Sequence, residues 1–82
     1  MDYHIESMTQ DESGIVCEFS YGGQEYEAAM DDYDGESYGI TIYRGYDPDF
    51  VHLDYTGFVN EEGMRKCVRD FIAVIEDGWT WN

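Results

Sequence analysis

The spacing of hydrophobic residues separates a C-terminal helical segment from a longer part with an alternating pattern. Between Asn60 and Gly78, hydrophobic residues recur at intervals of three and four, which places them on one face of an α-helix. These residues are Met64, Cys67, Val68, Phe71, Ile72 and Ile75. Asn60 is a favourable N-cap, and Gly78 is typical of the left-handed residue that follows a helix. The sequence therefore predicts one amphipathic helix over this segment.

The preceding residues alternate between hydrophobic and polar types, as expected for strands that bury one face. Five strands are predicted, at Tyr3–Thr9, Ile15–Tyr21, Gln24–Met30, Ser37–Arg44 and Phe50–Tyr55. The first of these has the poorest alternation. Gly22 and Gly23 between the second and third strands can adopt the positive φ of a two-residue hairpin turn. Short connections favour antiparallel neighbours, because a parallel crossover needs a dozen or more residues.

Together these elements predict an α+β fold in a single domain, 1–82. We expect an antiparallel sheet of four to five strands, arranged as a meander of hairpins, with the C-terminal helix packed on one face. One helix covers one face, so the opposite face of the sheet stays open. The alternation assigns seven residues to this open face: Glu18, Glu25, Glu27, Thr41, Tyr43, His52 and Asp54.

The charge of the chain changes this picture of an ordinary small domain. The 82 residues include 19 acidic and only 4 basic side chains, so the formal net charge is −15. Residues 1–58 hold 14 of the acidic residues and only Arg44 among the basic ones. The 43% hydrophobic and 17% aromatic content indicates a folded protein rather than a disordered acidic tail. Such a protein repels nucleic acids and anionic membranes, so the expected partners are cations or basic proteins.

The pattern of apolar residues also bears on location. The N-terminal residues lack the basic and apolar regions of a signal peptide, and no apolar run approaches the roughly 18–20 residues of a membrane span. Two distant cysteines do not make a disulfide scaffold. We therefore expect a cytoplasmic protein with free thiols.

Acidic residues on one strand and in two loops are the candidate contacts with a partner. Alternate strand residues lie about 6.6–6.8 Å apart, so Glu25 and Glu27 match roughly two steps of about 3.4 Å along a DNA strand. The predicted partner-binding residues are Glu25, Glu27, Asp31, Asp32, Tyr33, Asp34, Glu36, Tyr46, Asp47 and Asp49. Tyr33 and Tyr46 would be aromatic anchors among them. The alternative interpretation is a solvated acidic surface that keeps a small protein soluble.

Other chemistries find little support in the sequence. The segment Asp32–Glu36 resembles part of a calcium loop, but Met30 and Thr41 stand where such a loop needs ligands. Cys17 and Cys67 fall on inward faces, and their spacing from the two histidines gives no zinc motif. We therefore expect no metal site, no cofactor and no catalytic residues, and interpret the chain as a non-enzymatic binding protein.

In size, charge and tyrosine content, the chain resembles the small acidic phage-encoded inhibitors that imitate DNA, including anti-CRISPR proteins. The resemblance is one of class and not of motif, so it transfers no functional residue. It implies that acidic side chains block the nucleic-acid-binding groove of a bacterial defence effector, with a CRISPR effector complex as the expected partner, in the bacterial host cytoplasm. Two alternatives stay open: an immunity protein that neutralises a basic nuclease toxin, and a small structural or assembly protein. The sequence does not indicate an oligomeric state.

Overall fold

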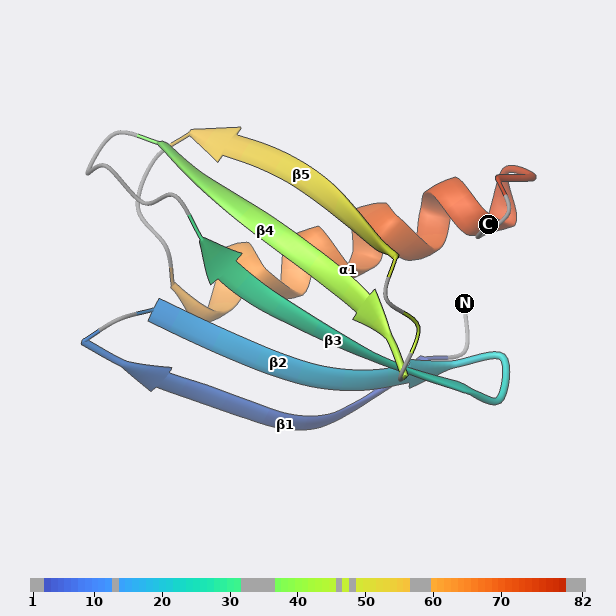
Figure 1. Cartoon of the computed structure of the whole chain (residues 1–82), viewed down its shortest axis with the longest axis horizontal. Coiled ribbons are helices and arrows are strands. Elements are labelled where there is room, and N and C mark those ends of the chain that lie inside the picture. The colour runs from blue at the N-terminus through green and yellow to red at the C-terminus, as the bar shows by residue number, and fades with distance from the viewer. Residues whose placement is uncertain are drawn as a thin grey trace.

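A computed structural model confirms the α+β fold that the sequence predicts (Figure 1). It describes residues 3–12, 14–31, 37–45, 47, 49–56 and 60–79, of which positions 11 and 31 are described by their backbone only. The strands are β1 (Tyr3–Asp11), β2 (Gly14–Tyr21), β3 (Gln24–Asp31), β4 (Ser37–Arg44) and β5 (Phe50–Thr56), and they are followed by helix α1 (Glu61–Glu76). Each strand begins or ends within two residues of its predicted limits.

The five strands form one antiparallel sheet in the order β1-β2-β3-β4-β5, so every strand pairs with its neighbour in sequence. Helix α1 runs across one face of this sheet (Figure 1). In the β2–β3 turn, Gly22 and Gly23 have φ values of 60° and 79°, the positive values that a type I′ hairpin turn requires. The short turns therefore explain the meander.

Strand β1 contains an irregularity that the alternation pattern alone did not locate. Ile5 pairs with Phe19 and Ser7 pairs with Glu18, so Glu6 is an extra residue in β1. Such a β-bulge shifts the alternation by one residue. Ile5 and Met8 consequently both pack against the core, although they are three residues apart. The bulge is the physical reason for the poor alternation of this strand.

The core lies between the inner face of the sheet and the apolar face of α1. Its buried residues are Ile15, Cys17, Phe19, Tyr26, Ala28, Tyr38, Ile40, Ile42, Met64, Cys67, Val68, Phe71 and Ile72. The Phe71 ring on the helix lies 6.0 Å from the ring of Phe19 and 5.2 Å from that of Tyr26, centroid to centroid. Fully burying one such side chain contributes about 1.5–3 kcal/mol. This contact holds helix and sheet together.

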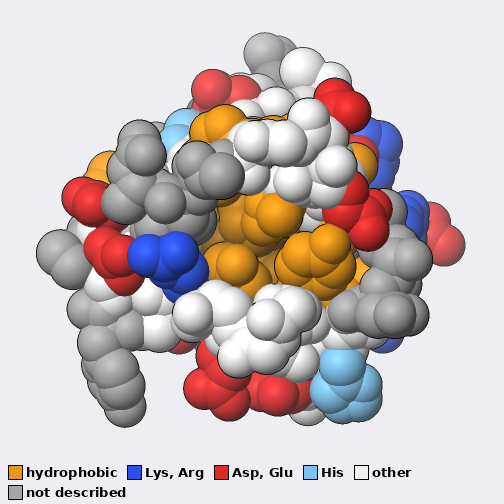
Figure 2. Space-filling model, turned by 90° about the vertical axis from the view of Figure 1, so that its right-hand side faces the viewer, with side chains coloured by type: hydrophobic (Ala, Val, Ile, Leu, Met, Phe, Trp, Pro, Cys, Tyr) orange, Lys and Arg blue, Asp and Glu red, His pale blue; other side chains and the backbone are white. Residues whose placement is uncertain are grey.

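Both ends of α1 have the capping groups that the sequence predicts. The Asn60 side chain accepts a hydrogen bond of 2.8 Å from the Gly63 N–H group. At the other end, Gly78 has a φ of 110°, and the N–H of Trp79 donates to the carbonyl of Val74. The Trp79 ring then packs edge-on against Phe71, at 6.2 Å. Figure 2 views this end of the molecule, where hydrophobic side chains gather in a hollow.

The helix covers the middle of the sheet better than its edges. An α-helix with its side chains is about 10–12 Å across, whereas the outer strands of a five-stranded sheet lie about 19 Å apart. The inward-facing residues of β1 and β5 are accordingly only half-buried: Tyr3, Ile5, Met8, Val51, Leu53 and Tyr55. The half-buried edges follow from packing one helix on five strands.

Candidate functional site

The face of the sheet that is turned away from α1, here called the open face, carries the strongest candidate site. Strand register places these described residues on it: His4, Ser7, Thr9, Val16, Glu18, Ser20, Glu25, Glu27, Ala29, Gly39, Thr41, Tyr43, Phe50, His52 and Asp54. Glu6, which has no partner in the register, lines a hollow together with three of these residues. The structure therefore confirms the assignment of the seven residues that alternation placed there. The pairing also arranges them in rows that cross the sheet.

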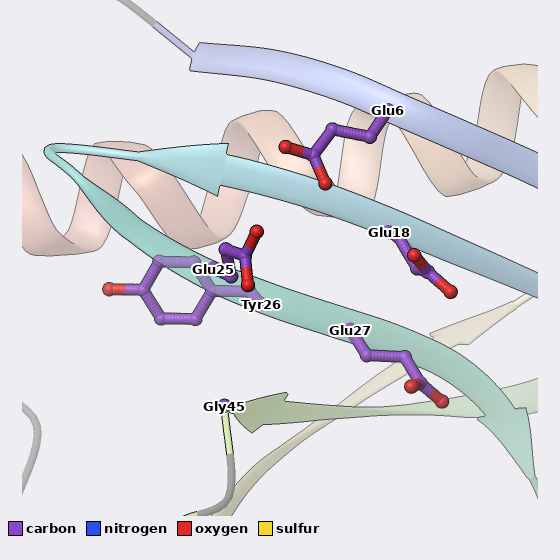
Figure 3. A pocket seen from close by; sticks show the side chains of 6 residues that line it. All are labelled: Glu6, Glu18, Glu25, Tyr26, Glu27 and Gly45. Atoms are coloured by element: carbon purple, nitrogen blue, oxygen red, sulfur yellow. The ribbon is translucent and has the colours of Figure 1, made fainter.

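Four glutamates, here called the glutamate quartet, line a shallow hollow on the open face (Figure 3). The quartet consists of Glu6, Glu18, Glu25 and Glu27, and it spans the three neighbouring strands β1, β2 and β3. Tyr26 and Gly45 complete the lining. The bulge in β1 matters here, because Glu6 is the extra residue and yet joins the quartet. A regular strand would place its side chain on the opposite face from Ser7.

The quartet concentrates like charges on paired strands. Glu18 lies directly opposite Glu27 in the β2–β3 pairing, an arrangement that destabilises an isolated sheet. Within the described parts of the sheet, the open face carries no Lys or Arg. The basic residues Arg65, Lys66 and Arg69 belong to α1 on the other side, and Arg44 pairs with Asp47 at 3.0 Å. A cationic partner would offset the repulsion between these glutamates, which no Lys or Arg on the described open face neutralises.

Two exposed rings adjoin the quartet and form what is here called the aromatic shelf. Tyr43 on β4 and Phe50 on β5 are paired residues, with ring centroids 6.1 Å apart. Their exposed fractions are 39% and 59%, which are high for large hydrophobic side chains. Glu27 pairs with Tyr43, so one row crosses the sheet from carboxylate to aromatic ring. Exposed aromatic residues beside charged ones are typical of protein interfaces.

A chain of hydrogen bonds begins in the next row, where Thr41 pairs with His52, and continues along β5 to Asp54. The Thr41 hydroxyl lies 3.1 Å from Nδ1 of His52, and Nε2 of His52 lies 3.1 Å from Oδ1 of Asp54. The order of hydroxyl, imidazole and carboxylate is that of a nucleophilic triad. The Thr41 side chain is only 4% exposed, however, so its hydroxyl is not presented to a substrate. This chain of bonds orients His52 on the open face.

The structure places some of the predicted partner-binding residues on this face or next to it. Glu25 and Glu27 are exposed on β3 and belong to the quartet. Asp49 is exposed beside the start of β5. The Asp47 carboxylate accepts hydrogen bonds from Arg44 and from the Asp49 N–H group, so it stabilises its own turn.

The remaining predicted residues are not brought together by anything that the structure describes. Asp31 ends β3, and only its backbone is described. The others lie outside the described residues: Asp32, Tyr33, Asp34, Glu36 and Tyr46. The structure instead adds four residues to the candidate contacts, namely Glu6, Glu18, Tyr43 and Phe50. Alternation had already assigned Glu18 and Tyr43 to the open face, whereas it had not assigned Glu6 or Phe50.

The two cysteines lie on the covered side of the sheet. Cys17 and Cys67 are fully buried, and burial raises the pKa of each thiol to about 11. Protonated thiols are poor nucleophiles and poor metal ligands. Nearby, the Tyr55 hydroxyl donates a hydrogen bond of 3.0 Å to Asp70, and burial raises the pKa of this hydroxyl as well. Among the residues that the structure describes, no group of three His, Cys, Asp or Glu side chains is arranged to hold a metal ion.

Comparisons of the chain with protein-family models, with curated protein sequences and with solved structures give no match. In the described part of the chain, no helix has both the length and the apolar character that crossing a membrane requires. The geometry and charge of the open face are therefore the features that indicate a function.

Proposed function

We propose that this protein is a non-enzymatic inhibitor whose open face imitates the charge of DNA. In this proposal the glutamate quartet occupies a groove lined by Lys and Arg in a nucleic-acid-binding protein, and nucleic acid is kept out of that groove. The resemblance to small acidic phage-encoded inhibitors favours a bacterial defence effector of the CRISPR type as the partner. The observation that carries the proposal is a sheet face with clustered carboxylates and no Lys or Arg among its described residues.

The spacing of the quartet suits this role. Neighbouring strands are about 4.7–4.9 Å apart, and alternate residues of one strand about 6.6–6.8 Å apart. Glu25 and Glu27, which are alternate residues of β3, are therefore separated by about two charge steps along one strand of a duplex, where successive charges occur about every 3.4 Å of axis. The sheet holds these positions in advance, so little ordering is needed when a partner binds.

The distribution of charge favours one orientation of binding. All three basic residues of α1 lie on the side of the sheet away from the quartet, and two of them are already paired. Arg65 contacts Glu61 at 2.8 Å, and Lys66 contacts Asp70 at 2.9 Å. A positively charged groove is attracted to the open face and less to the helix. Such complementarity speeds association and makes it sensitive to salt.

The test compares two variants with the same net charge. Glu18→Gln/Glu25→Gln/Glu27→Gln neutralises three residues of the quartet, whereas Glu62→Gln/Glu76→Gln/Asp77→Asn neutralises three exposed residues of α1 or its C-cap. Both variants have a formal charge of −12 instead of −15. Tagged proteins are incubated with lysates of bacteria that carry CRISPR systems, eluted with increasing salt, and the eluates are identified by mass spectrometry. Circular dichroism checks that both variants fold.

We expect the wild-type protein and the helix variant to capture the same nucleic-acid-guided effector. Excess duplex DNA should compete for it, and the quartet variant should lose it. Equal capture by both variants would refute the open face as the binding surface. Recovery of one small toxin in place of an effector would favour the immunity-protein alternative. A broad set of basic proteins, insensitive to either variant, would show that the charge serves solubility.

A further inference from the structure

We infer that the open face recognises arginine in preference to lysine, and that its partner is a protein surface that presents arginine side chains. The inference rests on the proposed function and concerns the same face. It goes further by naming the side chain that the partner supplies and the part of the face that receives it. That part is the row Glu18–Glu27–Tyr43–Phe50, which runs from the glutamate quartet to the aromatic shelf.

The register of three strand pairs creates this row. Glu18 pairs with Glu27, Glu27 with Tyr43, and Tyr43 with Phe50. Directly paired side chains on one face have Cβ atoms about 4.5–5.5 Å apart. A carboxylate and an exposed ring are therefore direct neighbours at the Glu27–Tyr43 pair. The second ring, Phe50, extends the apolar surface to the edge strand and is the more exposed of the two.

A guanidinium group fits both halves of this row, whereas an ammonium group fits only one. The guanidinium is planar, stacks on aromatic faces and pairs with a carboxylate through two parallel N–H donors. It is also less strongly hydrated than an ammonium group, so contact with a ring costs less desolvation. The tilted Tyr43 and Phe50 rings, with an interplanar angle of 53°, leave ring surface for such stacking. Lysine would gain the charge attraction of the quartet and little from the shelf.

The chain's own basic residues do not supply this occupant within one molecule. Arg44 is on the inner side at the end of β4 and pairs with Asp47. Arg65, Lys66 and Arg69 are on α1, across the sheet from the shelf. The uncompensated Glu18–Glu27 pair and the exposed rings together therefore point to a partner that brings both positive charge and a flat surface. A second copy of the chain is an outcome that the test below can identify.

The experiment uses two labelled peptides as probes of the intact protein, nona-arginine and nona-lysine, which have the same charge. Fluorescence anisotropy gives the Kd of each peptide at a fixed moderate salt concentration. The ratio of the two values is the readout, because the general attraction to an acidic protein acts on both peptides. Size-exclusion chromatography with light scattering, run with the protein alone, reports any self-association.

We expect nona-arginine to bind about 2–5 times more tightly than nona-lysine, the gain expected from a cation–π contact at an exposed site. Phe50→Ala and Tyr43→Ala should bring the ratio close to one and leave the nona-lysine Kd nearly unchanged. Phe50→Leu keeps apolar bulk without a ring and should behave like Phe50→Ala, whereas Phe50→Trp should keep the preference. In NMR spectra, the ring signals of Phe50 and Tyr43 should shift with nona-arginine and much less with nona-lysine.

Equal affinity for the two peptides, or a preference that Phe50→Ala and Tyr43→Ala leave intact, would overturn the inference. A stable dimer that disappears in Phe50→Ala would also overturn it, because the shelf would then be covered by a second copy. These failures differ from failure of the proposed function. If the quartet variant binds nona-lysine as tightly as wild type does, the open face is not the cation-binding surface at all. If only the arginine preference is absent, charge imitation by the quartet stands.

Discussion

The two faces of the sheet use the same five strands for opposite purposes. On the inner face, alternate residues are apolar and pack against α1, and Phe19, Ile40 and Ile42 are essentially inaccessible to water. On the open face, the intervening residues place glutamates opposite one another and leave two aromatic rings exposed. The inner face maximises stability, whereas the open face accepts a like-charge cost that folding alone does not explain. The open face is therefore the better candidate for a binding surface, because its residues lower stability.

The largest effect should come from replacing a phenylalanine of the core, and it is compared with the effect of replacing one on the open face. Phe71→Ala removes a ring that is 2% exposed and contacts Phe19 and Tyr26, so we expect a loss of about 3–5 kcal/mol in the free energy of unfolding. Phe50→Ala removes a ring that is 59% exposed and should change the free energy of unfolding by about 0.5 kcal/mol or less. Urea unfolding followed by circular dichroism measures both values.

Losses of similar size in these two variants would contradict the contrast between the faces. In an 82-residue domain the Phe71→Ala loss is comparable to the whole stability, so this variant is expected to be largely unfolded at 37 °C. Phe71→Leu, which keeps part of the buried volume, provides a milder version whose unfolding transition stays measurable.

An intermediate effect is expected from pH, because the buried thiols titrate differently in the folded and unfolded chains. Burial raises the pKa of Cys17 and Cys67 from the usual 9.0 to about 11, so between these values the folded state holds protons that the unfolded state has lost. The contribution of the two thiols to the free energy of unfolding is then fully present below about pH 9. It is lost as the pH rises through 11, and the loss is a few kcal/mol for both thiols together. Burial raises the pKa of Tyr26 and Tyr38 as well, which acts in the same direction.

Thermal unfolding between pH 7 and 11 measures this fall. Cys67→Ala has one raised thiol instead of two, so its melting temperature should decline less steeply with pH, although it starts from a lower value. Iodoacetamide should leave both thiols unmodified at neutral pH until the protein unfolds. A melting temperature that stays constant up to pH 11, or rapid labelling of the native protein, would show that these thiols are accessible.

The smallest effect tests the like-charge pair itself. Glu27→Gln removes one of two opposed carboxylates on the open face and should raise the free energy of unfolding by about 0.2–1 kcal/mol at low salt. Glu62→Gln is the matched control, because Glu62 favours the positive N-terminal end of α1 and its loss should lower stability by about 0.3–1 kcal/mol. Urea titrations at 20 and 200 mM salt measure the free energy of unfolding of both variants and of the wild type.

Opposite signs for these variants would show that local pairing, rather than the net charge of −15, sets the cost. Stabilisation by both variants to the same extent would mean that repulsion over the whole molecule dominates. In either case, added salt should reduce the difference between each variant and the wild type, because exposed charges are screened within about 10 Å at 0.1 M.

The hydrophobic pattern was enough to predict most of the fold. The period of the apolar residues in α1 and its caps at Asn60 and Gly78 are local properties, and they appear in the structure as expected. The strands β2 to β5 alternate cleanly and connect through short turns, so their antiparallel order follows from the chain's own geometry. The open face was predictable for the same reason.

The candidate site was less predictable, because it depends on which residues share a row across the sheet. The expected contacts included the segment from Asp31 to Glu36, whose side chains lie outside the described residues, and Asp47, whose carboxylate is engaged with Arg44. Glu6 was missed because a bulge breaks the period of two in β1. Phe50 stood at a predicted strand start, and nothing in the sequence alone showed that it would pair with Tyr43 and stay exposed.

The sequence by itself thus determined the secondary structure, the fold class and the concentration of acidic residues outside the helix, since each depends on neighbours in the chain. Tertiary structure alone decided that Glu6, Glu18, Glu25 and Glu27 form one quartet and that Tyr43 and Phe50 form a shelf beside it. The physical reason is register. The offset between paired strands, and one extra residue in β1, determine which side chains become neighbours, and a pattern within a single strand does not contain that information.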